Sequence, residues 1–468
     1  MNNKAIHWLR LCLLCLALLL PMHALGEGGL SLRVRGDLRS YGKTTVTVSV
    51  PEAGKLTVRL SDGVNPLGIL TRETPVEAGQ TVLDWDGCGW YGEPLPEGGY
   101  SLSASLDTGI RVLTAKATFN LKRCSQALLY ALPASNTLYL EEGNRWYAEV
   151  QLTHKGSVKM AVFAAGAPEE PLAVFNKNQY VTDKPVEFHW DGAVKGKRLA
   201  PGDYVLRFYA AKNPDRQIEC PIRIAQGIRS LPPVAVTGPI FPGRNLNDQA
   251  LWTLMQQPSV VADVQPKHHL DLREEPDPKA RSLGWVHGRN QAMAVLELPG
   301  NGWARVGAWE HDAGLYIEGW VPVSQLYTVA PHPDYGLLVD LQACRMTVFY
   351  RGKRLGDLAV TIGQPNPKEL WRKTAAGLFL TGDRVDGYTA SGMHYDYEIL
   401  FDGGNLFHQI GYSYTRGKKD FSQQSATLGM AASHGCLRLP ADGTDGFNAW
   451  WIYSHIPVGT RVVILPAE

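Results

Sequence analysis

The sequence predicts a chain of several small domains built mainly from β-strands. Its 468 residues exceed what one hydrophobic core usually organises, so about three or four domains are expected. The chain has 48 Gly and 30 Pro, and its Val, Thr, Tyr and Trp residues fall in short alternating runs, which is typical of strands separated by turns. A motif also recurs about 105 residues further along the chain, as expected for repeated modules.

The composition argues against several classes of partner. The chain has 46 basic and 45 acidic residues, a formal net charge of +1. Nucleic-acid binding and electrostatic attachment to a membrane both need a strongly basic surface. We therefore expect neither a nucleic-acid partner nor an electrostatic membrane anchor.

Residues 1–26 are expected to be a secretory signal peptide. Lys4 and Arg10 precede the apolar run at residues 11–20, and small residues at 24–26 supply a cleavage site. The run is shorter than the roughly 18 residues that a spanning helix needs. We expect an exported protein that meets the membrane only through this peptide and then acts at the cell wall, on the periplasmic or extracellular face; an uncleaved anchor is the alternative.

The repeated motif begins with Trp-Asp-Gly and ends at a turn before Tyr. Its first copy, DWDG at residues 84–87 and PEGGY at 96–100, recurs as HWDG at 189–192 and PGDY at 201–204. In both copies an alternating strand leads into the first turn and another follows the second, as in antiparallel sandwiches. The motif resembles the Ig-like domain of flagellar hook-capping proteins, which implies spacing or docking without catalysis.

This resemblance implies two Ig-like β-sandwiches, residues 27–123 and 124–226. Trp85 and Trp190 should lie at matching positions in the two sandwiches.

Residues 227–266, rich in Pro and Gly, are expected to be a linker with a short helix near 248–255. Residues 267–330 then form short strands separated by turns. Their Gly-Trp-Ala-Arg-Val and Gly-Trp-Val strands, around Trp303 and Trp320, resemble those of bacterial SH3-like domains. We expect both Trp side chains in the core of a small barrel; a peptide-binding groove is the alternative.

Histidines in and near this segment lack the spacing of a metal site, and they are expected at the surface: His268, His269, His287 and His311.

After cleavage five cysteines remain, so at least one cannot form an intramolecular disulfide. Cys124 and Cys220 lie near the first and last strands of the second sandwich and are a candidate pair, while Cys344 is expected to be a packing residue. No pair has the CxxC spacing of a zinc or redox site, so neither a metal nor another cofactor is expected.

The stretch SHGCLR at residues 433–438 is the strongest sign of chemistry. Cys436 lies between Gly and Leu and close to Ser and His, unlike a buried packing cysteine. A nucleophilic cysteine needs an imidazole or backbone donors that favour its thiolate. Gly435 would let its own N–H and that of Cys436 face a developing oxyanion. His408, at the end of an apolar strand, is the candidate base.

This stretch resembles the signature of the YkuD-type L,D-transpeptidase catalytic domain: a His on one strand, then Ser/Thr-His-Gly-Cys, an aliphatic residue and Asn or Arg. Residues 374–379, TAAGLF, stand where the family has Thr-Pro-x-Gly-x-Phe. The resemblance implies a C-terminal β-sandwich catalytic domain over residues 333–468.

By this resemblance Cys436 attacks the third residue of a peptidoglycan stem peptide, D-Ala leaves, and a thioester forms. The amine of another stem then takes the acyl group. His408 would act as acid and base, while Ser433 and His434 would shape the pocket. The other residues expected to meet substrate are Arg438, Gln409, Phe407, Thr374 and Gly377.

Two departures from the family pattern concern the surroundings of His408. Twenty-four residues separate His408 from Ser433, so residues 411–432 are expected to form a lid beside the site. Gln409 replaces the usual Gly or Ser, and Ala375 a usual Pro, which leaves open what orients His408. His434 is the alternative base, disfavoured because neighbouring strand residues point to opposite faces.

Several functions stay open at this point. Hydrolysis of the thioester would make an L,D-carboxypeptidase, a protein amine as acceptor would make a wall-anchoring enzyme, and the three upstream modules would also suit a non-catalytic wall-binding scaffold. The resemblance implies that carbapenems acylate Cys436, and we expect a monomer.

Overall fold

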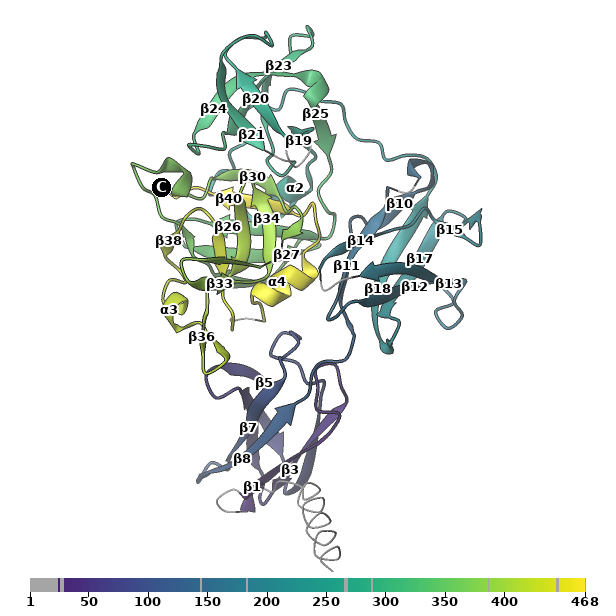
Figure 1. Cartoon of the computed structure of the whole chain (residues 1–468), viewed down its shortest axis with the longest axis vertical. Helices are drawn as coiled ribbons and strands as arrows, with labels where there is room; N and C mark the ends of the chain where they lie inside the picture. Colours follow the sequence, from purple (N-terminus) through teal and green to yellow (C-terminus); the bar gives the residue numbers. More distant parts are fainter. Residues whose placement is uncertain are drawn as a thin grey trace, which may run out of the picture. The chain divides into compact units, whose positions relative to one another are not determined.

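The computed structural model describes residues 24–25, 29–143, 145–181, 184–264, 268–287, 289–385, 387–442 and 446–467 (Figure 1). Nearly all of the expected signal peptide therefore lies outside the described residues. Strands hold 52% of the chain and helices 7%, which confirms a mainly β, multidomain protein. The chain divides into two compact units, residues 1–125 and 126–468. None of the helices in the described ranges has the length and apolar character needed to span a membrane.

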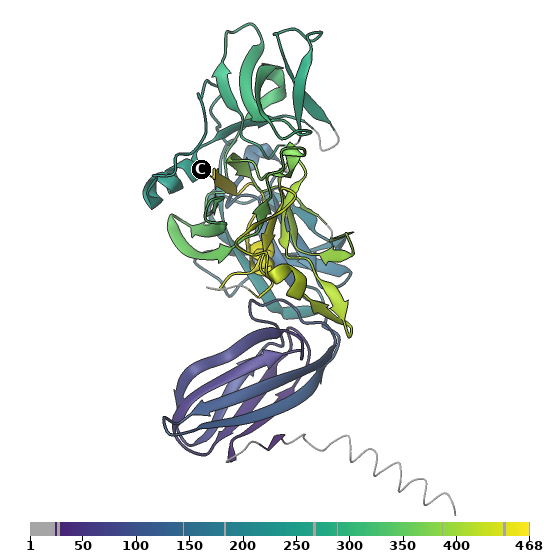
Figure 2. The same cartoon turned by 90° about the vertical axis from the view of Figure 1, so that its left-hand side faces the viewer.

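Unit 1 is a sandwich of two antiparallel four-stranded sheets (Figure 2). Alternate residues of its third strand, including Val46 and Val48, point into the core between the sheets. The first sheet has the order β1 (Ala24–Leu25), β2 (Ser31–Gly36), β3 (Thr44–Val50), β6 (Gly79–Trp85), and the second β5 (Pro66–Val76), β4 (Gly54–Ser61), β7 (Gly98–Asp107), β8 (Val112–Leu121).

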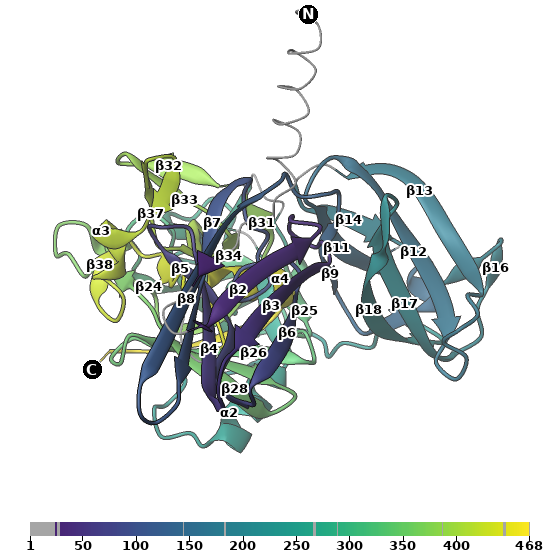
Figure 3. The same cartoon turned by 90° about the horizontal axis from the view of Figure 1, so that it is seen from below.

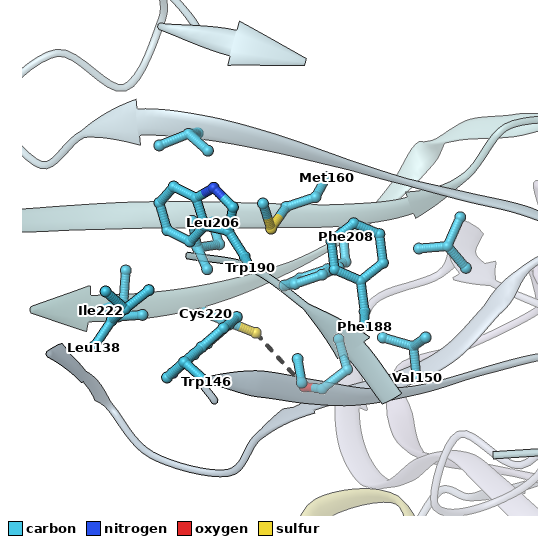
Figure 4. Close-up of a cluster of buried hydrophobic side chains, with 14 of the residues drawn as sticks. Leu138, Trp146, Val150, Met160, Phe188, Trp190, Leu206, Phe208, Cys220 and Ile222 are labelled. Carbon is cyan, nitrogen blue, oxygen red and sulfur yellow. Dashed lines mark hydrogen bonds between the residues drawn. The ribbon is translucent and has the colours of Figure 1, made fainter. Parts of the chain in front are cut away.

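Unit 2 begins with another sandwich, whose five-stranded sheet is seen from below in Figure 3. Phe188, Trp190 and Phe208 fill the space between its sheets, as Figure 4 shows. The larger sheet has the order β10 (Thr137–Tyr139), β18 (Asn213–Ala225), β17 (Gly202–Ala210), β12 (Gly156–Ala164), β13 (Ala173–Val181), and the smaller β14 (Val186–His189), β11 (Tyr147–Leu152), β9 (Leu128–Pro133). A 3-10 turn (Leu140–Glu142) and the short pair β15 (Ala193–Val194) and β16 (Lys197–Arg198) complete it.

The repeated motif forms the same structure in both sandwiches. The indole N–H of Trp85 donates to the carbonyl of Cys88 at 2.9 Å, and that of Trp190 donates to the carbonyl of Ala193 at 3.0 Å. The hydroxyl of Tyr100 likewise donates to the carbonyl four residues before it, as that of Tyr204 does. Trp85 and Trp190 therefore occupy equivalent positions, as the repeat predicts.

The candidate disulfide between Cys124 and Cys220 is absent. All five described cysteines are reduced. Cys220 is buried in the core of the second sandwich, with its sulfur 3.6 Å from the carbonyl oxygen of Ala131. The sulfur of Cys124 lies 3.1 Å from the carbonyl oxygen of Ser125. Each sulfur is thus directed to its own local partner.

A five-stranded antiparallel sheet follows, which we call the β20–β24 module (residues 269–322). Its core is aliphatic, with Leu272, Val295 and Val306 fully buried, whereas Trp303 and Trp320 are only half-buried. The expectation that these two Trp side chains fill the core is therefore wrong. The strand order is β21 (Ser282–His287), β20 (His269–Arg273), β24 (Tyr316–Pro322), β23 (Trp303–Trp309), β22 (Ala294–Glu297).

The segment before this module contains the expected helix, α2 (Asp248–Gln256), followed by β19 (Ser259–Ala262), which pairs with β25 (Leu326–Val329) after the 3-10 turn at Val323–Gln325. Met255 of α2 packs in one cluster with Phe349 and Val463 of the C-terminal sheet. Much of this segment is thus a packed part of unit 2.

The C-terminal segment contains two main sheets. As the alternating pattern predicts, a tight turn at Arg351 and Gly352, both with positive φ, joins two of its strands. The larger sheet has the order β28 (Lys353–Ala359), β27 (Arg345–Tyr350), β26 (Tyr335–Asp340), β40 (Arg461–Leu465), β30 (Gly377–Leu380), and the smaller β31 (Arg384–Val385), β34 (Glu398–Asp402), β35 (Asn405–Gln409), β39 (Leu437–Leu439).

Shorter elements surround these sheets. They are the pairs β29 (Ile362–Gly363) with β38 (Ala431–Ser433), β32 (Tyr388–Ala390) with β33 (Met393–Tyr395) and β36 (Ser413–Thr415) with β37 (Lys418–Asp420), a 3-10 turn (Leu370–Arg372), and helices α3 (Ser422–Ser425) and α4 (Ala449–His455).

Candidate active site

The parallel pairing of β35 with β39 brings His408 next to the cysteine motif. His408 pairs directly with Arg438, and Cys436 precedes Arg438 by two residues. Because directly paired residues share a face of a sheet, the side chains of His408 and Arg438 project from the same face, whereas Cys436 lies just before β39. The charge of Arg438 acts on both the His408 imidazole and the Cys436 thiol, so the guanidinium lies near both groups.

A backbone carbonyl orients the imidazole of His408. Its Nδ1 lies 2.7 Å from the carbonyl oxygen of Gln409, which can only accept, so Nδ1 carries the proton and Nε2 is an acceptor. The hydroxyl of Tyr388 lies 3.4 Å from Nε2. Burial, followed by the charge of Arg438, lowers the pKa of His408 to about 4, and the ring is 1% exposed. His408 is thus neutral near pH 7, with one tautomer.

Opposing influences act on the Cys436 thiol. Burial raises its pKa, and the carboxylate of Asp402 acts in the same direction. The backbone N–H of Leu406 and the charge of Arg438 lower it. Because the net shift is upward, the resting group is a thiol, and a nucleophilic thiolate requires that the proton pass to a base.

Hydrogen bonds on both sides hold the turn before Cys436. The Ser433 hydroxyl donates to the carbonyl of Cys436 at 2.6 Å and accepts from the N–H of Gly435 at 3.2 Å. The Thr374 hydroxyl donates to the carbonyl of Gly435 at 2.8 Å and accepts from the N–H of Gly363 at 2.9 Å. Gly435 has φ +117°, and a Cβ there would overlap the side-chain oxygen of Asn405. Only glycine fits this turn.

These bonds correct one expectation. The N–H of Gly435 is directed to Ser433 and so does not face a developing oxyanion in this structure. The backbone N–H groups that lower the pKa of the Cys436 thiol are instead those of Leu406 and Cys436.

Three residues expected to meet substrate belong to the core instead. Phe407 is fully buried, with its ring centroid 4.7 Å from that of Phe401. The side chain of Gln409 is buried and, by strand alternation, faces away from His408. Gly377 is buried in β30, where it pairs with Ile464. The apolar sequence around these residues serves packing.

A pocket of about 500 Å³ opens beside Cys436. His434 also lines it, with its ring stacked near Trp371 at a centroid distance of 6.0 Å. His408 is absent from the lining. The lining residues are His287, Gln291, Trp309, Glu310, His311, Asp312, Gly314, Trp371, Lys373, Ala375, Asp402, Gly403, Gly404, Asn405, His434 and Cys436.

Several residues around the site escaped the sequence analysis. Tyr388 and Tyr395 stack on each other at 4.7 Å, and Tyr395 also meets the ring of His408 at 5.0 Å. Asp402 stands at the end of β34, where burial raises its pKa to about 6. The Asp-Gly-Gly turn signal at 402–404 could have indicated Asp402, but nothing local points to the two tyrosines.

His287 and His311, expected at an uninvolved surface, lie on the pocket wall.

Residues 411–432, expected to be a lid, form the hairpin β36–β37 and helix α3. Lys419 of the hairpin pairs with Asp396 at 2.5 Å, and Gln424 of α3 accepts a hydrogen bond from Arg438 at 2.8 Å. This segment thus touches the cation of the site, but the pocket lining includes none of its residues.

The residues of the site are of the types that acyl transfer uses. A thiol, a neutral imidazole of defined tautomer, backbone donors and a buried guanidinium can form and resolve a thioester. Across the described ranges, no group of three or more His, Cys, Asp or Glu side chains is placed to hold a metal ion.

Comparison with known proteins identifies the C-terminal segment. Residues 334–464 match the YkuD family model, described as the L,D-transpeptidase catalytic domain. A curated relative, the candidate L,D-transpeptidase YciB of Bacillus subtilis, is 39% identical over 62 residues, which cover 13% of this chain and 28% of that protein. The chain thus spans just over a quarter of the length of this relative.

Solved structures with partial similarity include two L,D-transpeptidases. That from Mycobacterium smegmatis has 17% identity and a TM-score of 0.24, covering 45% of this chain and 97% of that chain. The catalytic domain from Enterococcus faecium has 19% identity and a TM-score of 0.20, covering 28% and 98%. These scores are too low to identify the fold, so the assignment rests on the family match. Residues 334–464 are an L,D-transpeptidase catalytic domain of the YkuD family.

Proposed function

We propose that this chain is an exported L,D-transpeptidase that joins peptidoglycan stem peptides through a thioester on Cys436. The family match over residues 334–464 supports cross-linking of peptidoglycan as the general activity. The single observation that best supports the mechanism is the pairing of β35 with β39, in which His408 lies opposite Arg438, two residues after Cys436.

In the first half-reaction His408 Nε2 takes the thiol proton as the sulfur attacks the carbonyl carbon of the third stem residue. The N–H groups of Leu406 and Cys436, which lower the pKa of the thiol, are the candidates to stabilise the oxyanion. The C–N bond to D-Ala then breaks, and the imidazolium returns its proton to the leaving amine. The Gln409 carbonyl accepts from Nδ1 throughout, which keeps the ring in place.

In the second half-reaction the amine of another stem attacks the thioester. His408 removes its proton, the C–S bond breaks, and the thiol forms again. Water in place of the amine would make the enzyme an L,D-carboxypeptidase. Arg438 stabilises the thiolate through its charge and, as a guanidinium that can grip a carboxylate, remains the proposed carboxylate-binding cation.

Export and the roles of the upstream modules belong to this proposal. Residues 1–26 would direct the chain out of the cytoplasm to the cell wall, and peptidoglycan is cross-linked there. The two sandwiches would serve as spacing or docking modules for a monomeric enzyme at the wall.

The deciding experiment is mass spectrometry of purified stem tetrapeptides incubated with the full chain. Loss of D-Ala with a dimer mass is expected for the transpeptidase, and loss of D-Ala with a free tripeptide for the carboxypeptidase. Cys436→Ala should abolish both products. The control is Cys344→Ala, which removes a cysteine from the turn between β26 and β27 and should keep the products of the native chain. If the native chain left the tetrapeptide unchanged, the result would contradict the enzyme and favour a non-catalytic wall-binding scaffold.

A further inference from the structure

The pocket beside Cys436 has two walls from distant parts of the sequence. One wall comes from the catalytic domain, including Asp402 and Lys373. The other comes from the β20–β24 module, including Glu310, His311 and Asp312 in the turn between β23 and β24. A module that would otherwise be a separate binding domain thus borders the reacting sulfur.

Hydrogen bonds fix the module wall to the catalytic domain. The indole N–H of Trp309 donates to the carbonyl of Ala376 at 2.7 Å, and the N–H of Ala292 donates to that of Leu378 at 3.0 Å. The N–H of Leu380 donates to the carbonyl of Asn290 at 2.7 Å. These contacts repeat along β30, so the wall is held in place beside the pocket.

The charges of the pocket favour a cationic ligand. Three of the lining residues named above have carboxylates: Glu310, Asp312 and Asp402. Among the same residues Lys373 is the single lysine or arginine, and burial lowers its pKa. His311 and His434 have pKa values lowered by burial, which favours their neutral forms. The N–H groups of Asp312 and Ala313 donate to the Glu310 carboxylate and hold the turn.

Asp312 is the module carboxylate best placed to meet a ligand. It is exposed, and its Oδ2 accepts from the Trp285 indole at 2.9 Å. The guanidinium of Arg438, in contrast, is outside the pocket lining, where it bonds Gln424. The positive charge of Arg438 is therefore not among the groups that line the pocket.

We infer that the β20–β24 module forms the acyl-acceptor subsite of the enzyme, with Asp312 and Asp402 binding the ammonium of an amine-bearing stem peptide. This inference rests on the proposed function, since it assigns the partner of the second half-reaction. The module then selects the amine acceptor over water and raises cross-linking relative to hydrolysis.

The test uses Nα-acetyl-L-lysine amide as the acceptor and a stem tetrapeptide as the donor with the full chain. Asp312→Asn keeps an oxygen that can accept from Trp285 but removes the charge. The acceptor KM should rise about 2- to 5-fold, because a partly exposed charge pair contributes at most about 1 kcal/mol. Asp312→Lys should raise it further. Glu275→Gln removes an exposed carboxylate of the same module outside the pocket and should behave as the native chain.

Two further measurements separate charge recognition from structural damage. Hydroxylamine, which is mostly uncharged at neutral pH, should be used equally well by Asp312→Asn and the native chain, because it brings no ammonium to the pocket. In the Cys436→Ala background, Nα-acetyl-L-lysine amide should bind more tightly than the norleucine analogue, and Asp312→Lys should remove the difference.

An acceptor KM that stays the same in Asp312→Lys, or equal binding of the lysine and norleucine amides, would overturn the acceptor subsite. Failure of the native chain to release D-Ala from the tetrapeptide would instead overturn the proposed function. The binding comparison in Cys436→Ala requires no turnover, so the two failures are distinguishable.

Discussion

Arg384 and Glu149 form a buried ion pair at 2.8 Å, although 235 residues separate them in the sequence. Arg384 in β31 belongs to the catalytic domain and Glu149 in β11 to the second sandwich. The guanidinium also donates to the carbonyls of Tyr453 and Ile456, and the hydroxyl of Tyr130 donates to the same carboxylate oxygen at 3.2 Å. This network joins the sandwich to the catalytic domain within unit 2.

Loss of either partner of this pair should destabilise unit 2. Glu149→Gln leaves a buried, uncompensated guanidinium and should lower the free energy of unfolding by about 3–5 kcal/mol. The double variant Glu149→Leu with Arg384→Met should lose less stability than the sum of the losses in its two single variants. Each single variant leaves one unpaired buried charge, whereas the double variant leaves none. Urea unfolding checks both; Glu274→Gln, from an exposed pair, should change stability by less than about 1 kcal/mol. Additive single effects would argue against a coupled buried pair.

The assignment of the base is tested by carbapenem acylation followed by intact mass. Cys436→Ala should give no adduct, and His408→Ala should slow its formation by about 10²- to 10⁴-fold, the usual contribution of general acid–base catalysis. His434→Ala removes a pocket-lining ring stacked on Trp371 and should have a smaller effect. A larger rate defect from His434→Ala than from His408→Ala would exchange the two roles.

The reactivity of the thiol should respond to its two charged neighbours in opposite directions. The Asp402 carboxylate raises the pKa of Cys436, so Asp402→Asn should lower that pKa and move the pH profile of iodoacetamide alkylation to lower pH. The Arg438 charge lowers the same pKa, so Arg438→Met should move the profile to higher pH. In the native chain Asp402 has a pKa of about 6, and protonation below this pH should relieve its effect. Profiles that shift in the same direction in the two variants would contradict this electrostatic arrangement.

Thr374 should act through the turn that carries Cys436. Thr374→Val removes the hydroxyl that bridges Gly435 and Gly363, each bond contributing about 1 kcal/mol. Acylation should slow while the fold is retained, and Thr374→Ser, which keeps the hydroxyl, should recover most of the rate. Circular dichroism and the acylation rate of both variants check this; equal defects in Thr374→Ser and Thr374→Val would mean that the hydroxyl is not the important group.

The sequence by itself determined the features that depend on neighbouring residues. Alternating runs and Trp-Asp-Gly turns predict the two sandwiches, because strand and turn preferences act over a few residues. The order Ser-His-Gly-Cys likewise indicates the nucleophile, since the glycine and the thiol act within one turn.

Only the tertiary structure decided which distant groups meet that nucleophile. In the folded chain the hydroxyl of Tyr388 lies near His408 Nε2, and Asp312 lines the same pocket as Cys436. The N–H of Gly435 donates to the Ser433 hydroxyl within the turn. The tertiary structure also buried Phe407 and Gln409, and it joined Arg384 to Glu149. These contacts depend on how sheets and modules pack across more than two hundred residues in some cases, and no local pattern records such packing.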